Sequence, residues 1–241
     1  MILRSVIKHV HDQNWVAVLL DFLIVVLGIF VGLQVTDWNE QRQAKAREYA
    51  WLIQLSEDLD AMRAEFAVIT ARAGARSEQA RRAFRALEAC DRDRASEEDF
   101  ETVFARYQNQ RTATIVSRTY DEMVASGALA GMDDRGLSGR IAGLFGGLET
   151  YVEFIDGVRV SLPVIDRIVW QNVDLSFDTE DRPALGGFDF EAICQNRELR
   201  NAVWEIQDLF FDWESITTRA IEQLESTANA LGSHLNKSDA I

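Results

Sequence analysis

The chain has 241 residues, a formal net charge of −14 at pH 7 and a pI near 4.7. Nucleic-acid binding needs a basic face, so this charge argues against nucleic acid as a partner, and it also argues against a protein that lies flat on anionic lipid. The two prolines in the whole chain, with abundant Ala, Leu, Glu and Arg, predict an all-α fold with enough residues for one substantial core.

Residues 1–14 form a short N-terminal tail in which apolar residues recur at helical spacing, with Arg4, Lys8 and His9 between them. This pattern predicts a helix lying in a membrane interface, and the alternative is an ordinary positively charged flank. The run from Trp15 to Val35 is then almost wholly apolar and, at 1.5 Å per residue, about 31 Å long, which matches the hydrocarbon thickness of a bilayer. We therefore predict a single transmembrane helix over residues 15–36. A helical pattern follows it directly, without a small-residue cleavage site, which favours an uncleaved anchor.

The ends of the predicted span carry residues typical of a membrane boundary. These are Trp15, Gln34, Trp38, Asn39 and Glu40. Lysine and arginine are similarly frequent on the two sides of the span, so their count does not decide the orientation. The short tail and the acidic body favour a cytoplasmic N-terminus and a body outside the cytoplasm, which for a protein of the bacterial inner membrane would be the periplasm.

One face of the predicted span is suited to contact with another helix. It carries Asp21, Val25, Gly28 and Gly32, and the two glycines form a GxxxG pattern that allows close backbone approach. A carboxylate inside the span costs a few kcal/mol unless it is neutral, paired or able to reach the headgroups, about 9 Å away by helical rise. A proton or ion pathway is a further alternative, but one helix cannot enclose one. We predict that this face packs against a second copy or another membrane protein.

Two segments carry a resemblance to a known family. The residues DFLIVVLGIFVGLQVTDWNEQR, from Asp21, and TYDEMVASGAL, from Thr119, resemble segments of a bacterial family named domain of unknown function 6090. The matching positions in the first segment are Asp21, Gly28, Leu33, Gln34, Trp38, Asn39 and Glu40. The chain departs from the family pattern at Thr36-Asp37, where two asparagines are usual, and at Gly32. The resemblance stops before residue 155, and it implies a membrane anchor and a helical body but names no activity.

Beyond the membrane, the apolar pattern becomes a heptad, which predicts one helix continuing to about residue 90, with Gly74 as a candidate kink. The heptad positions are Leu52, Leu55, Leu59, Met62, Phe66, Ile69 and Ala73. Ser96 with Asp99 predicts a capping box at the start of a second helix, and Thr119 with Glu122 predicts another before a stop at Gly127. The apolar stripe of the second helix is Phe100, Val103, Phe104 and Tyr107, followed by an irregular stretch over residues 108–117.

A longer heptad predicts a helix over residues 137–169, kinked at Pro163. Its positions are Leu137, Ile141, Leu144, Leu148, Tyr151, Ile155, Val158, Leu162, Ile165 and Val169. Glycines also recur at this spacing, at Gly136, Gly139, Gly143 and Gly146, which predicts close approach of a neighbouring helix. Residues 172–187 are expected to be a loop. Its acidic residues only faintly resemble a calcium loop, because the glycine and the final glutamate that calcium needs are missing.

The last predicted helix runs from Phe190 to about Leu235, with its strong half at Leu199, Val203, Ile206, Phe210 and Trp213. Residues 37–235 are thus expected to form an elongated antiparallel bundle or coiled coil, and residues 236–241 a disordered tail. Catalytic, metal-binding and cofactor-binding motifs are missing from the sequence, so we expect a protein that is not an enzyme and holds no metal or cofactor.

If the long helices alternate in direction, Cys90 and Cys194 lie at the same end of the bundle, far from the membrane. The pair is then a candidate disulfide in an oxidising compartment. The alternative is that Cys90 is a small buried hydrophobe continuing the heptad.

Two functional hypotheses follow. The first is a single-pass interaction or scaffold protein that self-associates or joins a membrane complex, with the lipid bilayer and a membrane protein as partners. The second is a sensor-like module that captures a small ligand without catalysis. A closed bundle favours the first, and a deep pocket lined by polar residues favours the second.

Overall fold

The computed structural model describes residues 15–238 and, for residues 15–18, 21 and 238, the backbone alone. The predicted interfacial tail, residues 1–14, lies outside the described residues. The chain divides into two compact units, Met1–Ala50 and Trp51–Ile241. As predicted, the class is all-α, with one short hairpin among the helices.

The described part of the first unit is a single helical stretch, the beginning of α2 (Trp15–Ala89). Large apolar side chains between Leu19 and Trp38 are 43–63% exposed. A helix with exposed apolar residues on all sides is unfavourable in water, so this segment needs a partner or a lipid environment to cover it, and the described residues do not provide that cover.

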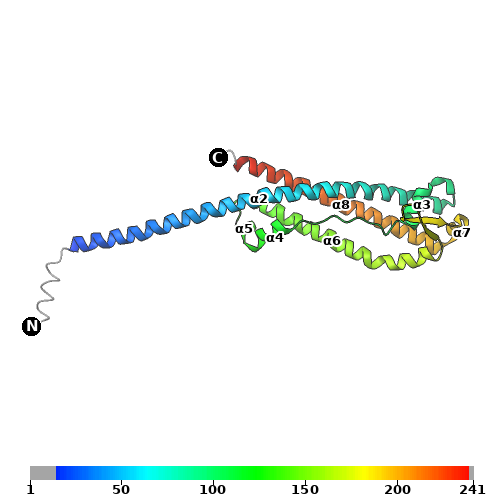
Figure 1. Cartoon of the computed structure of the whole chain (residues 1–241), viewed down its shortest axis with the longest axis horizontal. Helices are drawn as coiled ribbons and strands as arrows, with labels where there is room; N and C mark the ends of the chain where they lie inside the picture. The colour runs from blue at the N-terminus through cyan, green and yellow to red at the C-terminus, as the bar shows by residue number, and fades with distance from the viewer. Residues whose placement is uncertain (1–14, 239–241) are drawn as a thin grey trace, which may run out of the picture. The chain divides into compact units, whose positions relative to one another are not determined.

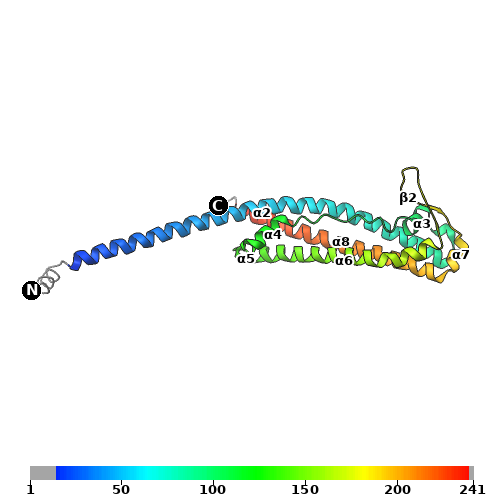
Figure 2. The same cartoon turned by 60° about the horizontal axis from the view of Figure 1, so that its bottom comes forward.

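The second unit is a bundle of three long helices that alternate in direction, as predicted (Figures 1 and 2). They are the remainder of α2, α6 (Arg135–Trp170) and α8 (Arg197–Ser238). The shorter elements are η1 (Arg92–Arg94), α3 (Glu97–Phe104), α4 (Arg118–Ala125), α5 (Ala128–Gly131), β1 (Asp174–Phe177), β2 (Pro183–Gly187) and α7 (Phe190–Gln195). In both views α3, α7 and the hairpin lie at one end of the bundle, and α4 and α5 lie towards the other.

The core of the bundle follows the predicted heptads. Every predicted position from Leu52 to Ala73 on α2 is buried, and so is every predicted position on α6 except the half-buried Leu162. Phe66 of α2 meets Tyr151 of α6 edge to face, with ring centroids 5.0 Å apart. Helix α6 continues through Pro163, and α2 continues through Gly74, beside which Glu214 of α8 packs. The outer half of α8 is also packed, since Leu224 and Leu231 are fully buried.

The predicted capping box at the start of α3 is confirmed. The Ser96 hydroxyl accepts from the Asp99 amide, and the Asp99 carboxylate accepts from the Ser96 amide. The same carboxylate is buried and receives two hydrogen bonds from the Arg82 guanidinium, at 3.1 and 2.7 Å. Burial raises the pKa of Asp99, but the hydrogen bonds from Arg82 and Ser96 outweigh it and leave that pKa below its usual value.

We expect Asp99→Asn to lower the free energy of unfolding by about 1–3 kcal/mol at neutral pH, because it weakens a charge-assisted bidentate contact. A carboxylate whose folded pKa is depressed stabilises the fold above its unfolded pKa, about 3.9, and loses that contribution as pH falls through the folded value. The variant should therefore converge with the wild-type protein in strong acid. Urea unfolding at pH 7 and pH 3 measures this. A constant difference between the two proteins at both pH values would contradict it.

Helix α3 ends at Phe104, so Tyr107, expected in its apolar stripe, lies in a turn over residues 105–108. Residues 109–117 are irregular, as predicted, and return along the bundle as an extended segment whose backbone is held by side chains (Figure 1). The Ala113 amide donates to the Tyr151 hydroxyl at 2.8 Å, and the Thr114 amide donates to the Glu65 carboxylate at 3.1 Å. These side chains accept hydrogen bonds from backbone amides that would otherwise be paired within a helix or a strand. The segment is thereby held beside α2 and α6.

The prediction for the glycines of α6 was wrong. Gly136, Gly139, Gly143 and Gly146 are exposed, and no neighbouring helix lies within 4 Å of where their Cβ atoms would stand. They repeat at the same spacing as the buried heptad positions of α6 but lie on a different side of the helix. At 100° per residue, that side is roughly 150° away from the buried one. Close approach occurs instead at Gly147, where an added Cβ would collide with Gln223 of α8.

Four further boundaries differ from expectation. Residues 172–187 contain an antiparallel hairpin, because the Asp178 carboxylate accepts from the Glu180 and Arg182 amides and closes its turn. The last helix is broken at Asn196, which caps α7 and whose side chain accepts from the first amides of α8. Helix α4 starts at Arg118, so Thr119 is no cap; its buried hydroxyl donates to Asp58. Helix α8 runs to Ser238, beyond the expected end at residue 235.

Candidate functional site

The predicted helix-contact face of the span is open in the first unit. Val25 is 59% exposed, and added Cβ atoms on Gly28 and Gly32 would meet nothing within 4 Å. The Thr36 hydroxyl donates to the Gly32 carbonyl at 3.0 Å, so its hydrogen bond is already made within the helix. The side chain of Asp21 lies outside the described residues. The face is therefore smooth and accessible where the chain is described.

The predicted boundary residues follow on the same helix. Trp38 is 63% exposed, and the Arg42 guanidinium lies 5.9 Å from its ring centroid, a cation–π arrangement. Gln34, Asn39 and Glu40 are exposed, and the side chain of Trp15 lies outside the described residues. Among residues 15–238, one helix is long and apolar enough to cross a membrane, and no part of its apolar stretch is buried.

The structure brings Cys90 and Cys194 together in a disulfide, with Cα atoms 5.3 Å apart. Cys194 is buried in α7, whereas Cys90 is exposed, so the alternative of a small buried hydrophobe at residue 90 was wrong. Cys90 has a φ of 51° and ends α2 in a Schellman motif. In this motif the Cys90 amide donates to the Leu87 carbonyl, and the Asp91 amide donates to the Ala86 carbonyl. Glycine is the usual residue at this position, and a cysteine there pays a conformational cost.

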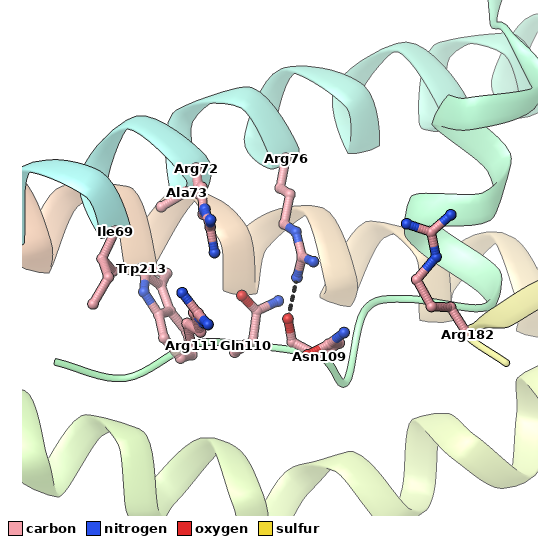
Figure 3. A pocket seen from close by; sticks show the side chains of 9 residues that line it. All are labelled: Ile69, Arg72, Ala73, Arg76, Asn109, Gln110, Arg111, Arg182 and Trp213. Carbon is pink, nitrogen blue, oxygen red and sulfur yellow. Dashed lines mark hydrogen bonds between the residues drawn. The ribbon is translucent and has the colours of Figure 1, made fainter. Parts of the chain in front are cut away.

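A cavity of about 480 Å³ lies against α2, the extended segment and α8 (Figure 3). Its walls are Ile69, Arg72, Ala73, Arg76, Asn109, Gln110, Arg111, Arg182 and Trp213. Sequence reasoning missed this site, because its residues come from four separate stretches of the chain. Figure 3 shows Arg72 and Arg76 reaching from α2 towards Asn109, Gln110 and Arg111 on the extended segment.

The arginines of the cavity differ in how they are neutralised. Arg182 stands at one end and pairs with Asp178 at 2.8 Å and Glu180 at 3.0 Å. Arg76 is half-buried and donates to the Asn109 and Arg106 carbonyls, at 2.6 and 3.4 Å, and no acidic side chain within residues 15–238 forms an ion pair with it. Burial, followed by the positive charges of Arg72 and Arg106, lowers the pKa of Arg76, although an arginine remains protonated in proteins.

Comparison with protein-family models, curated proteins and solved structures finds no match to this chain. The resemblance of the Asp21 and Thr119 segments to domain of unknown function 6090 therefore stays a prediction. Among the described residues, no group of three or more His, Cys, Asp or Glu side chains is placed to hold a metal ion.

Proposed function

We propose that this chain is a single-pass membrane protein whose anchor associates with another transmembrane helix, either in a second copy or in another membrane protein. The observation that carries the proposal is the exposure of every apolar side chain from Phe22 to Leu33, which a bilayer would cover. The open Gly28–Gly32 face supports lateral contact, because small residues let two backbones approach closely.

The orientation with the body outside the cytoplasm draws support from the disulfide. Disulfides persist in oxidising compartments such as the bacterial periplasm and are rare in the cytosol. A Cys90–Cys194 bond therefore fits a periplasmic body and a cytoplasmic N-terminus. Reporter fusions after Ser238 that fold only in the periplasm would be active in this orientation and inactive in the reverse one.

Replacing both Gly28 and Gly32 with isoleucine should weaken association in the membrane, because the added side chains hold the two helices apart. Within the single chain the new side chains enter open space, so a loss of association cannot come from damage inside the chain. Intermolecular crosslinking or energy transfer in native-like membranes measures the change.

The matched control is Leu23→Ile with Phe30→Ile, on the opposite face of the same helix at about 100° per residue. This pair should leave association unchanged. Equal crosslinking in the glycine variant and the wild-type protein would place the contact elsewhere and remove the support for this face.

The second functional hypothesis, capture of a small ligand by the body, is favoured by one observation. The bundle contains a cavity lined by polar residues, beside its closed apolar core. The two hypotheses are compatible, since the cavity and the anchor lie in different units of the chain. Whether the chain catalyses a reaction is a separate matter, and our expectation that it does not stays a prediction.

A further inference from the structure

We propose that the cavity against α2, the extended segment and α8 binds a small organic anion that carries two or more carboxylate or phosphate groups. This inference concerns the second unit alone and does not depend on the membrane-anchor proposal. Three observations carry it: the local charge, the way that charge is positioned, and the composition of the cavity wall.

The charge of the cavity is opposite to that of the whole chain. The chain carries 39 acidic and 25 basic residues, yet the cavity wall contains four arginines and no aspartate or glutamate. Arg182 is neutralised by Asp178 and Glu180, so the positive charge of the cavity comes from the other three arginines, Arg72, Arg76 and Arg111. Within residues 15–238, Arg72 and Arg111 have no ion pair with an acidic side chain, and Arg76 bonds only to backbone carbonyls. Such a concentration of one sign in a concave site attracts ligands of the opposite sign.

These arginines are held together at a cost to the fold. Arg72 and Arg76 are four residues apart on α2, a spacing at which like charges repel. Arg111 faces them from the extended segment, whose path is fixed by the contacts of Ala113 and Thr114 with neighbouring helices. Arg72 and Arg111 are exposed, so an anion from solution can reach both guanidinium groups and reduce the repulsion between them and Arg76.

The wall also offers groups that select among anions. Trp213, Ile69 and Ala73 are buried core residues whose surfaces line part of the cavity, so an apolar portion of a ligand can pack there. The amide side chains of Asn109 and Gln110 add neutral hydrogen-bonding groups. Guanidinium groups bind carboxylate and phosphate through paired hydrogen bonds, and a volume of about 480 Å³ is suited to a small metabolite-sized ligand.

Isothermal titration of the full chain in detergent micelles, in a buffer free of multivalent anions, tests the proposal. Citrate and inorganic pyrophosphate are the probes, and acetate is the monovalent comparison. We expect saturable binding of at least one probe and much weaker binding of acetate. The tighter of the two probes distinguishes a carboxylate ligand from a phosphate ligand. Arg72→Gln and Arg111→Gln should each weaken binding at least about tenfold, the effect of losing a charge-assisted contact.

Arg85→Gln is the matched control, because Arg85 is exposed on the same helix and lies outside the cavity. It should leave binding unchanged. A second readout separates a binding role from a structural one: without anion, the Arg72 and Arg111 variants should melt at the same temperature as the wild-type protein or higher, because each removes a repelling charge. Failure of both probes to saturate, equal weakening by Arg85→Gln, or a lower melting temperature with unchanged binding would overturn the proposal.

Discussion

Replacing Cys194 with serine should lower the free energy of unfolding by about 4 kcal/mol in non-reducing buffer, because a cross-link across a loop of roughly 100 residues restricts the unfolded chain to that extent. The two cysteines are separated by 104 residues in sequence, so the loop is of this length. Urea unfolding of the full chain in micelles, followed by circular dichroism with and without a reductant, measures the effect. Reductant should bring the wild-type protein close to the variant.

Cys90→Gly provides a sharper comparison, because residue 90 has a left-handed backbone that glycine adopts without strain. Without reductant this variant should be less stable than the wild-type protein, since it lacks the bond. With reductant it should be more stable than the wild-type protein by about 1 kcal/mol, the cost of holding a non-glycine residue in that conformation. A wild-type protein that is insensitive to reductant and matches Cys194→Ser would show that the bond contributes nothing.

The second large effect is expected for Leu144→Asp, which should unfold the bundle at a cost of several kcal/mol. Leu144 is 2% exposed in the core cluster that contains Phe66 and Tyr151, so an aspartate there is a buried charge without a partner. Loss of the helical signal and of cooperative thermal melting measures this.

The neighbouring residue supplies the control. Gly143 is exposed and an added Cβ would meet nothing within 4 Å, so Gly143→Asp introduces the same charge one position away without burying it. This variant should retain the helical signal and melt cooperatively. A soluble, helical Leu144→Asp protein with wild-type melting would mean that the buried face of α6 is not the one described.

The seams of α2 and α6 could be predicted from sequence because burial on a long helix repeats at a fixed spacing. The alternation of the long helices could also be predicted, since short connections favour antiparallel neighbours. The phase of the α6 glycines was missed because a spacing alone does not say which face is buried. The hairpin and the break at Asn196 were missed because each depends on one side chain that captures nearby amides.

The cavity could not be predicted for a different reason. When α2 is considered alone, Arg72 looks like an ordinary polar position of a heptad, and Arg76 falls on the weak continuation of the apolar heptad positions. Neither position by itself indicates a binding site. They line a charged cavity only together with Arg111, and the position of Arg111 depends on an extended segment that has no periodic sequence pattern. The side-chain contacts that fix this segment, such as that between the Ala113 amide and Tyr151, connect residues far apart in sequence. Single-sequence patterns carry no information about such contacts.

The Cys90–Cys194 bond also changes how the chain would carry a mechanical load. A pull between the N-terminal end of α2 and the C-terminal end of α8 passes through the sulphur atoms and bypasses residues 91–193. Helix α3, the extended segment, α6 and the hairpin thus form a closed covalent ring outside the line of tension. While the bond is intact, stretching the protein can peel α2 and α8 apart but cannot extend the ring that contains Arg111. After reduction, the same force would draw out the whole body.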